Sequence, residues 1–129
     1  MADIKLTLSN NTNLRSPNIE EEARWMQEEG PIYYALQGKP KEALPGGWVY
    51  FVREGLLAAR AKADDFVENS DLPSDEGQTY TGEPSPIKRW SVVCSSMETA
   101  THPIPHPGFQ GFRYVTPEEQ SDFEQAFVA

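Results

Sequence analysis

Residues 46–66, GGWVYFVREGLLAARAKADDF, decide the fold, because they have the clearest secondary-structure pattern in the chain. Two runs rich in aromatic, aliphatic and alanine side chains flank Glu54-Gly55, which is typical of two antiparallel strands joined by a tight turn. With a two-residue turn, one face is wholly apolar and carries Trp48, Tyr50, Val52, Leu57, Ala59, Ala61 and Ala63. The other face then carries Val49, Phe51, Arg53, Leu56, Ala58, Arg60 and Lys62.

The register of this hairpin is open between two interpretations. In the second one the turn spans three residues with Gly55 as a bulge, so that the pairing slips by one residue. Trp48 and Tyr50 then share a face with Arg60 and Lys62. We favour the two-residue turn, because large aromatics opposite alanines suit a curved sheet that closes over its own core. The register decides whether the aromatics form core or contact surface.

Upstream of the hairpin, the sequence predicts a strand, a helix and a short strand. Residues 4–8 alternate apolar and polar side chains, the period of a strand with one buried face. Residues 19–29 have apolar side chains at helical spacing, and Gly30-Pro31 ends this helix. Its large apolar side chains, Trp25 and Met26, should pin it to the sheet; the alternative is a Trp25 that faces a ligand. Residues 32–36 have the aromatic and β-branched content of a strand.

Downstream of the hairpin, the pattern is weaker. Residues 68–88 predict a long, mobile loop, because they are rich in Asp, Ser, Pro and Gly and have no sustained period. Residues 90–94 indicate a short buried strand. Residues 95–108 have three prolines among their last six residues, so we expect no regular structure throughout this segment. Residues 109–115 alternate as a last strand.

The C-terminal segment has the signals of a helix start. Thr116 is the expected N-cap, Pro117 the first helical residue and Glu119 the third. Phe123 and Phe127 stand four residues apart and should anchor this helix, which we expect to run to Phe127. Together these elements predict one α+β domain over residues 1–129, a small, mostly antiparallel β-barrel with a helix after its first strand and another at its C-terminus.

Composition narrows the classes of protein. The chain has 129 residues and a net charge of -9, which opposes non-specific coating of nucleic acid. Basic residues nevertheless gather in the middle of the chain, at Lys39, Lys41, Arg53, Arg60 and Lys62. No apolar run is long enough to span a bilayer and the first residues lack a signal peptide, so we expect a cytoplasmic protein without membrane association. The oligomeric state is open.

Marked catalytic and metal-binding motifs are missing from the sequence. It has no phosphate-binding glycine loop, nucleophile elbow, CxxC pair or HExxH helix. His102 and His106 each precede a proline, which favours extended backbone. They therefore do not share the helical face that makes a four-residue spacing useful for zinc, and we expect no metal. We also expect no cofactor. Cys94 lies in a mostly apolar run and is expected to be a buried, inert thiol.

Aromatic side chains beside lysine and arginine are the remaining candidates for a site, because such surfaces stack nucleobases. We therefore expect a binding wall from Trp48, Tyr50, Arg60 and Lys62, with additional ligand-binding candidates at Arg53, Trp25 and Tyr33.

The order of these elements and two stretches of sequence resemble the PUA-like superfamily of small barrels, in particular its ASCH and EVE branches. The stretches are PGGWVYFVREGLLAARAKADDF and FQGFRYVTPEEQSDFEQAF. The first is similar to the strand start Gly-Asp-x-Val-x-Phe and its alanine-rich return strand, and the second to the late strand and helix. The resemblance implies a pocket beside the central hairpin that takes an RNA or DNA base, sometimes a modified one.

The resemblance also implies a runner-up function. ASCH relatives carry a Gly-x-Lys-x-x-Glu-x-Arg signature near this point, and some of them are similar to small amidohydrolases that act on modified nucleosides. This chain has Gly38-Lys39-Pro40-Lys41-Glu42, with lysines one and three residues after the glycine and no arginine two residues after the glutamate. In an amidohydrolase, Lys39 or Lys41 would activate water and Glu42 would transfer protons.

We therefore hypothesise a non-enzymatic domain that binds RNA, DNA or a modified nucleoside. A third hypothesis is an acidic protein-interaction module, because the net charge suits a basic protein partner or mimicry of nucleic acid.

Overall fold

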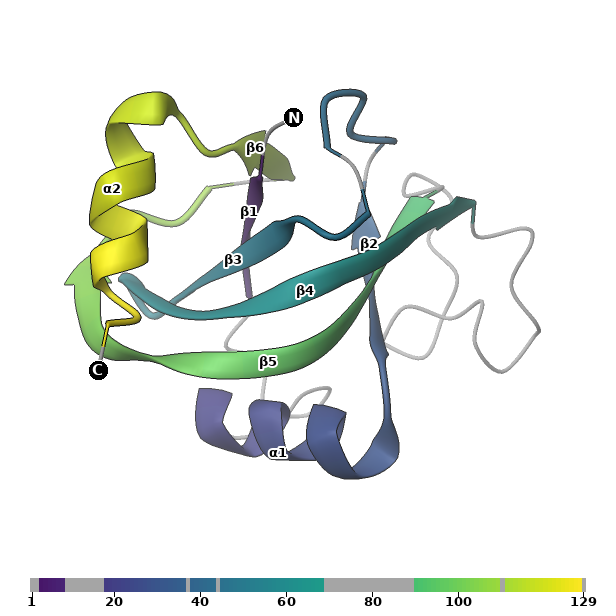
Figure 1. Cartoon of the computed structure of the whole chain (residues 1–129), viewed down its shortest axis with the longest axis horizontal. Coiled ribbons are helices and arrows are strands. Elements are labelled where there is room, and N and C mark those ends of the chain that lie inside the picture. The colour runs from purple at the N-terminus through teal and green to yellow at the C-terminus, as the bar shows by residue number, and fades with distance from the viewer. Residues whose placement is uncertain are drawn as a thin grey trace.

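Six strands form one curled sheet, a half-barrel with a helix at each side (Figure 1). The computed structural model describes residues 3–8, 18–36, 38–43, 45–68, 90–109 and 111–128. The elements are β1 (Ile4–Thr7), α1 (Ile19–Glu29), β2 (Ile32–Leu36), β3 (Trp48–Arg53), β4 (Leu56–Glu68), β5 (Trp90–Pro105), β6 (Phe112–Tyr114) and α2 (Pro117–Gln125). This confirms the predicted α+β class. The expected loop over residues 68–88 lies outside the described residues, apart from the last residue of β4.

The strand order is β2-β5-β4-β3-β1-β6, which places the hairpin β3–β4 at the centre of the sheet. The β1–β3 pair is parallel, and the other described pairs are antiparallel. Within the described residues, no helix is both long and apolar enough to span a bilayer.

The hairpin combines the two predicted registers. Glu54 and Gly55 both have positive φ, 56° and 77°, as a two-residue type I′ turn requires, and Val52 pairs with Leu57. A bulge at Ala58 then shifts the pairing. Beyond it, Tyr50 lies opposite Arg60 and Trp48 opposite Lys62. The favoured turn is thus confirmed, but the wholly apolar face it predicted is wrong.

Burial on both faces of β3 explains the bulge. Val49 and Phe51 are 0% exposed on one face, and Tyr50 is 0% exposed on the other. Without the bulge, Arg60 and Lys62 would point into the core beside Val49 and Phe51, and burying two unpaired charges there would be costly. With the bulge, the alternate residues Ala59, Ala61 and Ala63 enter that core instead.

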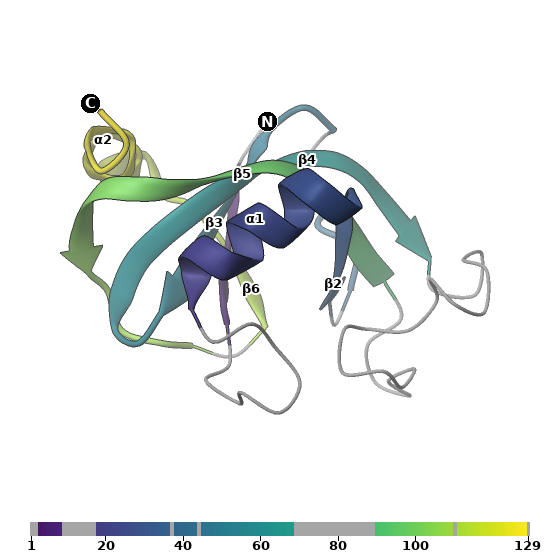
Figure 2. The same ribbon diagram turned by 90° about the horizontal axis from the view of Figure 1, so that it is seen from below.

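The sheet therefore separates two apolar cores. The larger core lies on the concave face, where α1 packs against β5 (Figure 2), and it includes Ile4, Leu6, Ile19, Met26, Tyr34, Val49, Phe51, Ala59 and Val92. The smaller core lies under α2 and includes Tyr50, Val52, Leu57, Val115, Phe123 and Ala126. The core positions of β3 alternate between these two faces, as the strand pleat requires.

Strand β5 corrects the expectation of irregular structure after residue 94, because it continues to Pro105. Its partner β2 extends only to the Ile32–Cys94 pair, so the later part of β5 is an edge on that side. Proline is tolerated on an edge, since no ladder partner needs its missing N–H group. Ser96 has φ 56° next to a break in the β4–β5 register, and such irregularities bend the strand around α1.

Both helices begin with the capping residues that their sequences indicate. The side chain of Asn18 accepts a hydrogen bond from Glu21 N, and Thr116 and Glu119 form a reciprocal capping box. Helix α2 ends at Gln125, two residues earlier than predicted. On α1, Met26 is 3% exposed and packs in the core as expected, whereas Trp25 is 44% exposed, so its prediction as a core residue is wrong.

Candidate nucleic-acid interface

Two cations lie over the indole of Trp48 on the α2 side of the hairpin. The Arg60 guanidinium carbon is 3.9 Å and the Lys62 ammonium nitrogen 4.0 Å from the centroid of the Trp48 ring. The shifted register brings these side chains together, because β4 beyond the bulge presents Arg60 and Lys62 to the face that carries Trp48. Trp48 is half-buried, so part of its indole remains accessible.

Glu98 and Phe127 fix the position of Arg60. The Arg60 Nε donates to Glu98 Oε1, the acceptor on its cross-strand partner in β5, and the guanidinium carbon lies 4.5 Å from the Phe127 ring centroid. The Arg60 side chain is 17% exposed. Lys62 makes no ion pair with any residue in the described ranges. We call Trp48, Arg60, Lys62, Glu98 and Phe127 the Trp48 cluster.

The backbone of Trp48 is held by Asp3. The Trp48 N–H donates to Asp3 Oδ1 at 3.0 Å, and Gln120 on α2 donates to Asp3 Oδ2 at 3.4 Å. One carboxylate thus connects the start of β3 with the N-terminal segment and the helix. This connection sets where the indole stands relative to α2.

Tyr50 supports the cluster from below and does not line it. Its ring is fully buried and packs at 5.2 Å from the Phe123 ring and 5.9 Å from the Phe127 ring. Burial raises the pKa of its hydroxyl, and Asp3 raises it further, while Arg60 and Gln120 oppose the rise. Within the described residues, the Tyr50 hydroxyl has no hydrogen-bond partner of good geometry, and this includes Arg60 and Gln120.

The other predicted ligand-binding residues lie apart from this cluster. Trp25 stands on α1, at the concave face of the sheet (Figure 2). Tyr33 is on β2, which two strands separate from β3. Arg53 follows the aromatic residues of β3 but is only 5% exposed. Of the seven predicted residues, the structure therefore brings together Trp48, Arg60 and Lys62, with Tyr50 beneath them.

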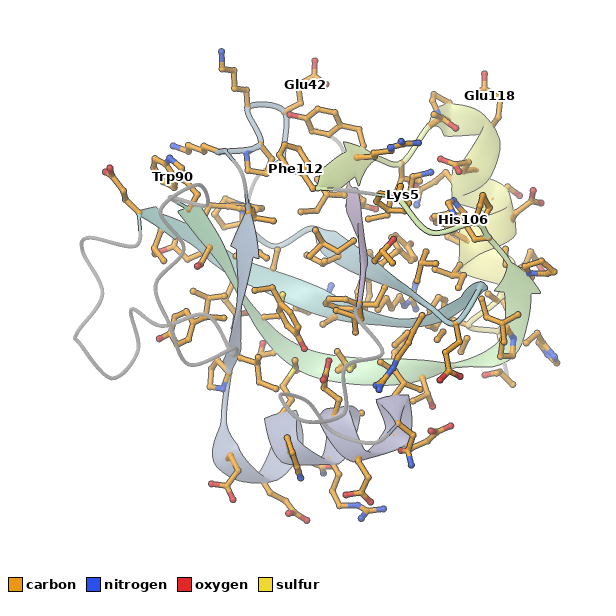
Figure 3. All side chains as sticks on the ribbon, turned by 180° about the vertical axis from the view of Figure 1, so that it is seen from behind. Lys5, Glu42, Trp90, His106, Phe112 and Glu118 are labelled. Carbon is orange, nitrogen blue, oxygen red and sulfur yellow. The ribbon has the colours of Figure 1, made fainter. Side chains whose placement is uncertain are left out.

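The residues of the runner-up hypothesis lie on the connection between β2 and β3. Lys39, Lys41 and Glu42 are all exposed. The Lys39 ammonium lies 5.2 Å from the Trp90 ring centroid, and the Glu42 N–H donates to the Tyr114 hydroxyl at 3.2 Å. In Figure 3, Glu42 stands above Phe112 and Trp90 stands to the left of it. The amidohydrolase hypothesis stays a prediction.

A buried lysine on the α2 side was not anticipated from the sequence. Lys5 on β1 is 6% exposed, and its ammonium lies 2.6 Å from Glu119 Oε2 and 3.1 Å from His106 Nε2 (Figure 3). His106 Nδ1 is 2.7 Å from the carbonyl oxygen of Pro107, which can only accept. This network assigns the proton to Nδ1, so that Nε2 accepts from Lys5. The cluster joins β1, the segment after β5 and α2.

Glu119 gives this ionic cluster a defined pH dependence. Burial raises its pKa, but the hydrogen bonds from Lys5 and the Thr116 backbone N–H, together with the charge of Lys5, outweigh burial, so the net pKa lies below its ordinary value of 4.5. A carboxyl whose pKa is lower in the folded state stabilises the fold above its unfolded pKa, and this contribution disappears as the pH falls through the folded pKa.

We therefore expect the stability difference between the wild type and Glu119→Gln to be present at neutral pH and to shrink as the pH falls below the ordinary glutamate pKa of 4.5. Glutamine is a suitable replacement, because it retains the capping-box acceptor and removes only the charge. Urea unfolding of both proteins at several pH values measures the difference. A difference that does not change across this window would contradict the ionic role of Glu119.

An acidic groove lies beside α2, between that helix, β6 and the β2–β3 connection. Its volume is about 610 Å³, and its lining includes the carboxylates Asp3, Glu42 and Glu124 and the ring of Tyr114. This groove collects part of the negative charge of the chain at one place. It is adjacent to the Trp48 cluster through Asp3, which belongs to both environments.

Cys94 and the histidines form no metal-binding group in the described parts of the chain. Cys94 is 0% exposed, and burial raises the pKa of its thiol well above the ordinary value. A neutral, inaccessible thiol is a poor nucleophile, which agrees with the structural role predicted for it.

Comparison with known proteins identifies the class of fold. No family model and no curated protein matches the sequence. Among solved structures, the ASCH protein of Zymomonas mobilis superposes with a TM-score of 0.64 at 12% identity, covering 98% of this chain and 96% of that one. A point mutant of the same protein superposes with a TM-score of 0.67 at 10% identity, covering 99% of this chain and 100% of that one. The chain therefore has the fold of these ASCH structures, as its sequence resemblance predicted.

Sequence reasoning missed Glu98 and the contact of Phe127 with Arg60. Glu98 lies in the segment predicted to be irregular. No sequence signal places it opposite Arg60, because the β4–β5 register shifts once before this pair and once after it. Phe127 was expected as a helix anchor and does pack on Tyr50. The pairing of Lys5 with Glu119 also has no local signal, since the two residues are 114 positions apart.

Proposed function

We propose that this chain binds nucleic acid by stacking a base on Trp48. The observation that carries the proposal is a half-buried indole contacted by two cations, Arg60 at 3.9 Å and Lys62 at 4.0 Å. Base stacking on an aromatic side chain supplies affinity, and adjacent cations attract the phosphate backbone. The sequence predicts a binding wall from these three residues and Tyr50, and the register that places Arg60 and Lys62 beside Trp48 supports the proposal.

The charge distribution favours a short, local contact over extended binding. The net charge of -9 and the acidic groove beside α2 repel a long phosphate backbone. The cations of the Trp48 cluster could contact one or two phosphates at most. The proposed ligand is therefore a single-stranded segment or a chain end that presents one accessible base.

Replacing Trp48 with alanine tests this function. Loss of one stacked base should weaken oligonucleotide binding by about 1–3 kcal/mol, which is roughly 5- to 150-fold in Kd. Fluorescence anisotropy with short labelled oligo-U and oligo-dT measures the change. Trp25→Ala is the matched control, because it removes an exposed indole from α1. Equal loss in both variants, or no binding by the wild type, would contradict the proposal.

The acidic groove favours a second candidate function, the binding of a basic protein segment. Three carboxylates around a tyrosine ring in an open groove suit lysine or arginine side chains. The two functions separate experimentally, because salt weakens both but only base stacking depends on Trp48. A lysine-rich peptide that binds the wild type and Trp48→Ala equally, with no oligonucleotide binding, would favour this second function.

A further inference from the structure

We infer that the Trp48 cluster recognises a phosphate-bearing nucleotide, with Lys62 as the phosphate contact and Arg60 as a positioning residue. The inference rests on the proposed function and assigns different roles to the two cations. The Arg60 guanidinium carbon and the Lys62 ammonium nitrogen lie 3.9 and 4.0 Å from the centroid of the indole, so distance alone does not distinguish the two cations. Their other contacts do.

Arg60 is held on several sides. Its Nε is bonded to Glu98, its guanidinium lies against both Trp48 and Phe127, and its side chain is only 17% exposed. A planar guanidinium with one edge on a carboxylate and its face on aromatic rings is a preorganised arrangement. Displacing it would separate an ion pair and two ring contacts. Arg60 therefore keeps the indole in place while a ligand binds.

Lys62 has the opposite environment. Its ammonium contacts the Trp48 ring, and it makes neither an ion pair nor a hydrogen bond with any residue in the described ranges. A lysine ammonium is a point charge on a flexible stem, free to swing about its side-chain bonds. A base that stacks over the centre of the indole competes with the two cations there, and Lys62 is the one with fewer contacts to lose.

Displacement of Lys62 favours a ligand with a phosphate. The charge of Arg60 is already balanced by Glu98, so Lys62 carries the uncompensated positive charge of the cluster. Once it leaves the indole, its ammonium regains a partner only if the ligand brings an anion next to the stacked base. A nucleotide within a strand does so, whereas a free nucleoside displaces the lysine without compensation.

The salt dependence of binding tests these roles. Each phosphate contacted on a single strand contributes about 0.7 to the slope of log K against log salt concentration. We expect Lys62→Met to lower that slope by about 0.7 for short oligo-dT and oligo-U, and to weaken their binding near 50 mM salt. Thymidine and uridine should bind weakly to the wild type and no more weakly to Lys62→Met.

Two further variants serve as controls. Lys39→Met removes a cation that also lies over a tryptophan, Trp90, outside the Trp48 cluster, and should leave the slope unchanged. Arg60→Met should weaken oligonucleotide and nucleoside binding by the same factor and keep the slope, as expected of a positioning residue.

The outcomes distinguish this inference from the function on which it rests. A slope that is unchanged in Lys62→Met, with binding still lost in Trp48→Ala, would overturn the phosphate role and leave base stacking intact. A slope that falls in Arg60→Met instead would show that the roles are reversed. No binding of any of the four probes to the wild type would overturn both proposals.

Discussion

Replacing Phe51 with alanine should lower the free energy of unfolding by about 3–5 kcal/mol, the usual cost of removing a buried phenylalanine ring. Phe51 is 0% exposed at the centre of the sheet, between Leu6 on β1 and Ala59 on β4. Its ring lies 4.9 Å from the Tyr34 ring. Because its neighbour on β4 is an alanine, no large side chain there can move to fill the space.

The shift in the midpoint of urea unfolding measures this loss. Leu56→Ala provides the control on the same hairpin, because Leu56 is 40% exposed and its replacement should change stability by less than about 0.5 kcal/mol. If Phe51→Ala does not fold, Phe51→Leu leaves a smaller cavity and should give an intermediate loss. Losses in the Phe51 variants no larger than that of the control would contradict the position of this core.

Replacing Lys5 with methionine should destabilise the fold by about 2–3 kcal/mol. Removing one partner of a buried ion pair typically costs about 3–5 kcal/mol, and the figure is lower here because Glu119 keeps 26% of its side chain exposed. Methionine retains most of the apolar stem of Lys5 and removes the ammonium, which lies 5.7 Å from the ring centroids of Phe109 and Phe123. The loss therefore reports the missing ammonium and the unpaired carboxylate.

A double-mutant cycle with Glu119→Gln isolates this interaction. Once the carboxylate is neutral, removing the ammonium no longer leaves an unpaired charge. The double variant should therefore be more stable than the sum of the two single losses predicts. Additive losses would indicate that Lys5 stabilises the sheet only through packing.

The same ionic cluster connects stability with the candidate site. Lys5 and Glu119 hold α2 against β1, and the segment after α2 supplies Phe127, which contacts both Tyr50 and Arg60. Weakening the Lys5–Glu119 pair should therefore loosen one wall of the Trp48 cluster. For this reason, binding experiments on variants of Lys5 need a parallel measurement of folding.

Local sequence signals were sufficient for the order and type of most elements. The alternation of residues 46–66 predicted the central hairpin, and Glu54-Gly55 predicted its turn, because both depend on neighbours within a few positions. The capping box at Thr116 likewise depends on residues three positions apart. The same signals identified Trp48, Arg60 and Lys62 as candidates from their residue types alone.

The tertiary structure decided which faces those residues share. The bulge at Ala58 has no local signature; it follows from the burial of both faces of β3, under α1 on one side and α2 on the other. The continuation of β5 past Cys94 depends on pairing with β4 across the sheet. The Arg60–Glu98 and Lys5–Glu119 pairs join residues far apart in the chain, and only packed elements bring such charges together. The sequence by itself thus determined the order and type of most elements and the residue types of the candidate site. The tertiary structure decided the register, and with it a Trp48 that faces two cations.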